Sequence, residues 1–170
     1  RPNPIVQMGL FLDGSGIPLA FNITPGNTNE QITLQPLEKQ IIKDFGLSKL
    51  VVCTDAGLSS IANRKFNSIG NRAYITVQSL KKIKAHLKDW ALDPNGWSLS
   101  GSDKEINISE IELNDNKNTY YKERWINENG LEERLIVSFS PKHALYQKGI
   151  RAKQVERAKV KTQSGQKLRK

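Results

Sequence analysis

The sequence has few of the residues that build disulfide frameworks, metal sites and membrane spans. Cys53 is the single cysteine, and the two histidines, His86 and His143, have no cysteine or carboxylate at zinc-ligand spacing. No apolar run approaches the roughly 18 residues of a membrane helix. We therefore predict a soluble, cytoplasmic protein with no disulfide, no zinc site, no membrane association and no small-molecule cofactor. Because its neighbours are apolar, Cys53 itself is predicted to lie in the core.

An initiating methionine is also missing, and the first residues, Arg1 to Pro4, contain no signal-peptide core. We therefore expect the chain to be part of a longer protein. Its 170 residues are enough for one compact domain with a small insertion.

Basic residues are concentrated at one end of the chain. Residues 141–170 contain ten Lys/Arg and one acid, Glu156, whereas the first 140 residues contain sixteen of each kind. The net charge of +9 therefore belongs to the C-terminal block. Such a block favours contact with a phosphate backbone. The alternative is a solvated helix followed by a frayed end.

Hydrophobic periodicity predicts an α/β fold in the first half of the chain. Gly14–Gly16 separates two strand-like runs, which predicts a hairpin. Thr28 or Asn29 is a candidate N-cap for the next helix, in which Pro36 marks either a bend or the first turn. A buried strand that follows a helix is expected to pair in parallel. The predicted elements are strands 5–13 and 17–24, a helix that ends at Phe45, strand 50–54, helix 59–66, strand 73–77 and helix 79–92.

A different pattern begins after residue 92. Residues 104–113 alternate between polar and apolar, as a half-exposed strand does, and the runs 119–127 and 131–140 are joined by Asn129-Gly130, a strong hairpin signal. A basic helix, weakened at Gly149, is expected from residue 143 to about residue 162. We therefore predict three parts: a core at 1–92, an antiparallel β insertion at 93–140, and a basic helix and tail at 141–170.

Asp55 is the residue whose position most favours chemistry. It comes directly after the apolar strand 50–54. Open α/β sheets bind their ligands at the carboxyl ends of strands, and the small residues Thr54 and Gly57 leave room for a cation and a phosphate. The alternative interpretation is that Asp55 only caps the following helix.

Five segments of the chain resemble one protein family. They read GLFLDGSGIPLAF (9–21), PGNTNE (25–30), VVCTDAGLSSIAN (51–63), YITVQSLKK (74–82) and FSPKHALYQKGIRAKQVERA (139–158). These segments are similar to the DDE transposases of bacterial insertion sequences, in the ribonuclease-H-like or retroviral integrase superfamily, within the group that has a β-rich insertion. The resemblance spans nearly the whole chain.

The resemblance implies an incomplete ribonuclease-H-like core, a mixed sheet flanked by helices, whose first strand lies upstream of Arg1. It implies three carboxylates that together hold two Mg²⁺ or Mn²⁺ ions for nicking and strand transfer. Only the second of these maps onto this chain, at Asp55, and it would be both the catalytic residue and a metal ligand. The third is expected on a helix beyond the basic tail. The resemblance also implies DNA as a partner, a homodimer on paired element ends and a bacterial, nucleoid-associated enzyme.

Two further acids are candidates for a catalytic role. Asp13 precedes glycine in the predicted turn, where aspartate is common. Glu156 lies in a KQVERA setting that differs from the family's glutamate helix, and it has basic neighbours at helical spacing. We expect a turn role for Asp13 and a charge-neutralising role for Glu156.

The remaining candidates have supporting or DNA-contacting roles. Asn27, with Glu30, is expected to fix the loop entering the first helix, and Asn63 is expected to brace the loop after Asp55. The candidate DNA-binding residues are Gln78, Lys81, Lys82, Lys148, Arg151 and Arg157. For the lysines a solvated helix face is the alternative. The tryptophans Trp90, Trp97 and Trp125 are predicted to be core residues, with base stacking as the alternative.

These observations favour part of a metal-dependent DNA transposase, in which this chain alone lacks the complete carboxylate triad. A non-catalytic DNA-binding remnant of a truncated element agrees with the basic tail and the missing first strand. A stand-alone nuclease of the same fold would need all its acids within this chain. A structural protein-binding domain has no specific residue in its favour.

Overall fold

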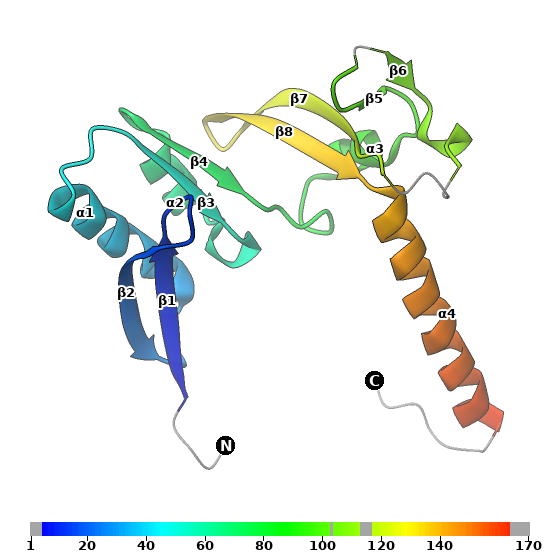
Figure 1. Ribbon diagram of the computed structural model, residues 1–170, viewed down its shortest axis with the longest axis horizontal. Helices are drawn as coiled ribbons and strands as arrows, with labels where there is room; N and C mark the ends of the chain where they lie inside the picture. Colours follow the sequence, from blue (N-terminus) through cyan, green and yellow to red (C-terminus); the bar gives the residue numbers. More distant parts are fainter. Residues whose placement is uncertain (1–4, 103, 113–116, 164–170) are drawn as a thin grey trace. The chain divides into compact units, whose positions relative to one another are not determined.

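The computed structural model describes residues 5–102, 104–112 and 117–163, which form a mixed α/β protein (Figure 1). The predicted α/β class is confirmed. The chain divides into two compact units. The first runs to Lys84 and the second begins at Ala85, while the short segment Asn129–Leu131 groups with the first. The predicted core boundary at residue 92 thus lies later in the chain than this division.

The first unit opens with the predicted hairpin. Strand β1 (Val6–Leu12) pairs antiparallel with β2 (Pro18–Pro25). Between them Asp13 Oδ1 accepts hydrogen bonds from the backbone amides of Ser15 and Ile17, both at 2.8 Å. Gly16 takes a positive φ of 83°, which glycine adopts without strain. The turn chemistry expected for Asp13 is therefore present.

A 3₁₀ turn, η1 (Glu30–Ile32), precedes the first helix, α1 (Leu34–Asp44). The N-cap of η1 is Asn29, whose Oδ1 accepts from the backbone amide of Gln31 at 3.1 Å. Pro36 lies in the first turn of α1, where a missing amide hydrogen costs no helical bond. The chain leaves the helix through Gly46, at a φ of +57°.

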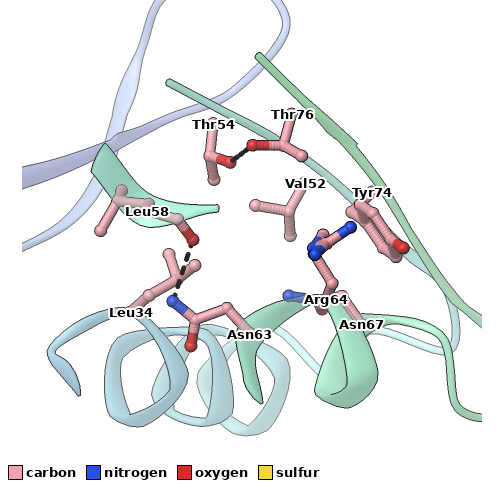
Figure 2. A pocket seen from close by; sticks show the side chains of 9 residues that line it. All are labelled: Leu34, Val52, Thr54, Leu58, Asn63, Arg64, Asn67, Tyr74 and Thr76. Carbon is pink, nitrogen blue, oxygen red and sulfur yellow. Dashed lines mark hydrogen bonds between the residues drawn. The ribbon is translucent and has the colours of Figure 1, made fainter. Parts of the chain in front are cut away.

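Strands β3 (Leu50–Thr54) and β4 (Arg72–Thr76) form a parallel pair, as predicted. Between them lie a 3₁₀ turn, η2 (Ala56–Leu58), and helix α2 (Ile61–Asn67). Helices α1 and α2 contribute side chains to one face of this pair, around the buried Val52 (Figure 2). Cys53 points to the other face and is exposed, so its predicted core position is wrong.

The strands of the first unit form two separate pairs, β1–β2 and β3–β4, and not one continuous mixed sheet. Each pair exposes an apolar face. In the hairpin the register stacks Met8 opposite Ile23 and Leu10 opposite Phe21, and these side chains are 48–66% exposed. In the parallel pair Val51, Ile75 and Val77 are exposed in the same way. We call these two surfaces the open apolar faces.

A buried acid joins α1 to α2 in the first unit. The Glu38 side chain is 0% exposed, and its Oε1 accepts from Asn67 Nδ2 at 2.8 Å. Among the described residues neither Glu38 Oε2 nor Asn67 Oδ1 has a hydrogen-bond partner. Burial raises the pKa of Glu38, against the opposing effects of the Asn67 hydrogen bond and the Arg72 charge. In the protonated carboxyl group Oε2 carries a hydrogen and can donate a hydrogen bond. Asn67 Oδ1 is a candidate acceptor for that bond.

Because its folded pKa is raised, Glu38 stabilises the fold most below its unfolded pKa, and this contribution is lost as pH rises through the folded value. We expect the free energy of unfolding, measured by urea denaturation, to fall with rising pH over that interval. Glu38→Gln, which cannot ionise, should remove this fall and stabilise the protein by about 1 kcal/mol at pH 7. Asp44→Asn, at an exposed acid of the same helix, should keep it. An unchanged pH slope in Glu38→Gln would contradict the role of this carboxyl.

The second unit contains a four-stranded sheet in the order β6-β5-β7-β8. Its strands are β5 (Trp97–Leu99), β6 (Glu105–Ile106), β7 (Tyr120–Glu128) and β8 (Leu131–Phe139). The strands predicted at 119–127 and 131–140 are confirmed, and Asn129 and Gly130 both take positive φ angles, as the predicted turn requires. Strand β5 was not predicted.

The strand predicted at 104–113 is mostly wrong. Only Glu105–Ile106 pairs with β5, and a 3₁₀ turn, η3 (Ile108–Glu110), follows directly. Asn107 causes the change, because its Oδ1 accepts from the Ser109 amide at 2.9 Å and so caps this turn. Residues 113–116 lie outside the described residues.

Helix α3 (Ala85–Leu92) is anchored to β7 by a buried lysine. Lys122 is 4% exposed, and its Nζ donates to the Asp93 carbonyl at 2.7 Å, just beyond the helix end. The same Nζ lies 5.1 Å from the Trp90 ring centroid and 4.8 Å from that of Trp97. These contacts explain why α3 belongs to the second unit. The predicted helix 79–92 therefore starts only at Ala85, and the residues before it form turns.

The tryptophans have three different environments. Trp97 is 4% exposed and packs edge-on against Phe139, with centroids 6.2 Å apart, while Trp90 is half-buried. Trp125, on β7, is 65% exposed, so its predicted core position is wrong. The last element, α4 (Pro141–Gln163), continues through Gly149 without a break. None of the helices in the described ranges is both long and apolar enough to cross a bilayer.

Candidate functional site

The carboxyl ends of β3 and β4 meet at one edge of the parallel pair. Thr54 and Thr76 are opposite each other in the register, and their hydroxyls are 2.9 Å apart in a hydrogen bond. The Thr76 hydroxyl lies 3.2 Å from the Asp55 carbonyl, and the Val77 amide donates to the Thr54 carbonyl at 3.2 Å. These bonds fix the backbone that carries Asp55. We call this region the strand-end site.

Asp55 caps the 3₁₀ turn η2. Its Oδ1 accepts from the backbone amides of Gly57 at 2.9 Å and Leu58 at 3.3 Å. The side chain is exposed, and within the described parts of the chain its Oδ2 has no hydrogen-bond partner. Asp55 therefore has a capping role, but at η2 and not at the following helix α2, whose N-cap is Ser60. This role leaves one carboxylate oxygen directed to solvent, where it can still bind a cation.

A second carboxylate lies beside the same turn. A Cβ placed on Gly57 would collide with Glu30 Oε1 and lie 3.2 Å from Asp55 Oδ1. Glu30 and Asp55 therefore approach the same position at Gly57, and a side chain there would displace the Glu30 carboxylate. The sequence assigned Glu30 to the loop entering the first helix and did not reveal this proximity, since the two acids are far apart in the chain.

Asn63 connects the site to both neighbouring helical turns. Its Nδ2 donates to the carbonyls of Leu58 at 3.0 Å and Gln31 at 2.9 Å, and its Oδ1 accepts from Gln35 Nε2 at 3.1 Å. The side chain therefore braces the loop after Asp55. Asn27 differs from its predicted role, because it lies exposed in the turn after β2 without a side-chain bond to any described residue. Its neighbour Asn29 caps η1 instead.

A small cavity lies beneath the strand-end site (Figure 2). Its volume is about 10 Å³, enough for roughly one water molecule and far below the several hundred Å³ of a small-molecule site. It is therefore a packing feature and not a substrate pocket. The lining residues are Leu34, Val52, Thr54, Leu58, Asn63, Arg64, Asn67, Tyr74 and Thr76.

The predicted DNA-binding residues fall in two regions. Gln78 lies two residues beyond the end of β4 and is exposed, at the same end of the parallel pair as Asp55. Lys81 and Lys82 are exposed in the turn that follows. Lys148 and Arg151 lie on α4 in the second unit, together with Arg157 and Glu156; all four are exposed.

No metal centre is complete in the parts of the chain that the structure describes. No three His, Cys, Asp or Glu side chains come together there, so Asp55 and Glu30 form the largest acidic grouping at the strand-end site. Carboxylate oxygens are suitable ligands for Mg²⁺, but this set is not sufficient for two ions. A comparison with family models, curated proteins and solved structures finds no match to this chain.

Proposed function

We propose that this chain is part of a DNA transposase of the DDE type, and that Asp55 is one of its catalytic carboxylates. The observation that carries the proposal is the position of Asp55 at the carboxyl end of a parallel strand, exposed and with Oδ2 available. This position agrees with the resemblance of the segments at 25–30 and 51–63. The same edge also presents Gln78, a candidate contact to DNA.

The proposed reaction is nicking of element ends and joining of the 3′ hydroxyl to target DNA. In such enzymes two divalent cations activate the attacking oxygen and stabilise the leaving oxygen. The residues described here do not supply a ligand set for that pair. We therefore propose that this chain supplies one metal ligand, Asp55, which alone cannot hold the two cations.

The proposed ribonuclease-H-like core also requires a continuous mixed sheet. The described residues supply an antiparallel pair and a parallel pair that are not joined. One additional strand between β1 and β3 would join them into a five-stranded sheet of the proposed kind. The open apolar faces are consistent with a larger core that covers them.

Two alternatives share the proposed fold. A non-catalytic DNA-binding remnant agrees with the basic helix α4 and with the incomplete acidic set. A stand-alone nuclease would need three acids within this chain, and Asp13, which the sequence offered, is engaged in the β1–β2 turn. The remnant is therefore the stronger alternative.

Translating the DNA on both sides of the coding segment tests the proposal against the remnant. We expect an upstream strand that ends in aspartate and a downstream helix that carries glutamate near arginine and aromatic residues. Terminal inverted repeats should flank the complete reading frame. Stop codons directly upstream and downstream would leave the remnant as the correct interpretation.

A further inference from the structure

Six cations of α4 form two stripes on opposite sides of the helix. At 3.6 residues per turn, the three side chains of each stripe fall within a sector of about 80° or less around the helix axis. The centres of the two sectors are about 180° apart. Stripe one consists of Lys148, Arg151 and Lys159, and stripe two consists of Lys142, Lys153 and Arg157. Each stripe contains two lysines and one arginine.

The stripes are unpaired in the structure. All six side chains are exposed, and none has an ion pair or hydrogen bond to any described residue. Glu156, the single acid of α4, forms no such bond either. With seven Lys/Arg and one acid, residues 141–163 carry a charge of +6. The like charges on such a helix repel one another. A polyanion that approaches the helix from both sides would reduce this repulsion and stabilise the helix.

We propose that α4 lies in the major groove of double-stranded DNA, with each stripe facing the phosphates of one strand. This inference rests on the proposed DNA contact and specifies how it is made. An α-helix of 10–12 Å diameter fits a groove about 12 Å wide. The six cations lie between Lys142 and Lys159 of α4, and a straight helix of this kind lies in the groove over part of one turn of B-form DNA. Phosphates line both walls of that groove, so cations on opposite sides of the helix are satisfied together.

The distribution of apolar residues on α4 argues against a membrane surface as the partner. A membrane-binding helix needs one continuous apolar face. Four of the five larger apolar side chains of α4 fall in a sector of about 140° that also contains stripe two, so three cations interrupt this sector. These four are Leu145, Tyr146, Ile150 and Val160, and the fifth, Val155, lies within stripe one. Double-stranded RNA fits less well than DNA, because its major groove is too narrow for a helix.

Fluorescence anisotropy with a 30-base-pair DNA duplex, without Mg²⁺ and without element ends, tests the inference on the whole chain. Two triple variants each neutralise one stripe: Lys148→Gln with Arg151→Gln and Lys159→Gln, and Lys142→Gln with Lys153→Gln and Arg157→Gln. We expect each to weaken binding by about 10- to 100-fold at 100 mM salt and to reduce the salt slope by about 2 to 3. A duplex RNA of equal length should bind more weakly.

A control variant carries the same loss of charge at three exposed lysines of the first unit, Lys43, Lys49 and Lys65. It should bind DNA within about twofold of the parent. A charge-retaining exchange in stripe one, with lysine and arginine swapped, should restore affinity. Far-UV circular dichroism of each variant separates lost contacts from a lost helix, because glutamine is compatible with helix formation.

Weakening in only one triple variant would mean that α4 lies on DNA by a single face and would overturn the inference. Affinity equal to that of the parent in both variants, tighter binding to anionic lipid vesicles, or bridging of two labelled duplexes would also overturn it. These readouts do not use Asp55 or catalysis. Loss of strand transfer and loss of groove binding are therefore separable results.

Discussion

Replacing Asp55 by asparagine is expected to reduce strand transfer by at least about 10³-fold in the transposase of which we propose this chain to be a part. Loss of a charged ligand from such a site removes about 4 kcal/mol or more of transition-state stabilisation. The fold should survive, because asparagine caps as well as aspartate and retains the oxygen that accepts from Gly57 and Leu58. The measurement is joining of a labelled element end to plasmid DNA.

Asp13 provides a matched control for this substitution. It is also an exposed aspartate whose Oδ1 accepts two backbone amides, from Ser15 and Ile17. Asp13→Asn should therefore have near-normal strand transfer and the same melting temperature as Asp55→Asn. Strand transfer retained in Asp55→Asn, or lost equally in both variants, would contradict the assignment of Asp55.

Replacing Trp97 by alanine is expected to destabilise the second unit by about 3–5 kcal/mol. The side chain is buried, its Nε1 donates to the Asp93 carbonyl at 2.8 Å, and its ring packs against Phe139. Its removal leaves a cavity and takes one of the two aromatic faces from the buried Lys122. Because all three tryptophans lie in the second unit, tryptophan fluorescence during urea denaturation reports on that unit alone.

Trp125→Ala is the control for this measurement, since it deletes the same side chain at a position that is 65% exposed. Its cost should stay within about 0.5 kcal/mol. Both variants keep two tryptophans as probes. Equal destabilisation by the two substitutions would contradict the assignment of Trp97 to the core of the second unit.

Local sequence patterns predicted the first unit well. Glycine and aspartate at the hairpin turn, and an apolar run after a helix, were sufficient to predict β1, β2 and β3 and the parallel pairing of β3, although not its partner β4. They also placed Asp55 at a strand end, because the run Leu50–Thr54 has a clear boundary. In each case neighbouring residues determine the structure.

Burial and long-range contacts were less predictable. Cys53 and Trp125 were assigned to the core from residue type, but whether an apolar side chain is buried depends on what covers its face of the sheet. The proximity of Glu30 to Asp55 depends on how two turns meet in space. The strand predicted at 104–113 failed because a single side chain, Asn107, offers the backbone a competing turn.

The open apolar faces make the self-association of this chain depend on salt concentration. Its net charge of +9 keeps copies apart at low ionic strength. Salt shortens the range of that repulsion to about 8 Å at 0.15 M but leaves the attraction between apolar surfaces such as Met8, Leu10, Phe21 and Ile23. If α4 binds DNA as we propose, the salt that releases the DNA also favours self-association, so salt titrations require low protein concentration.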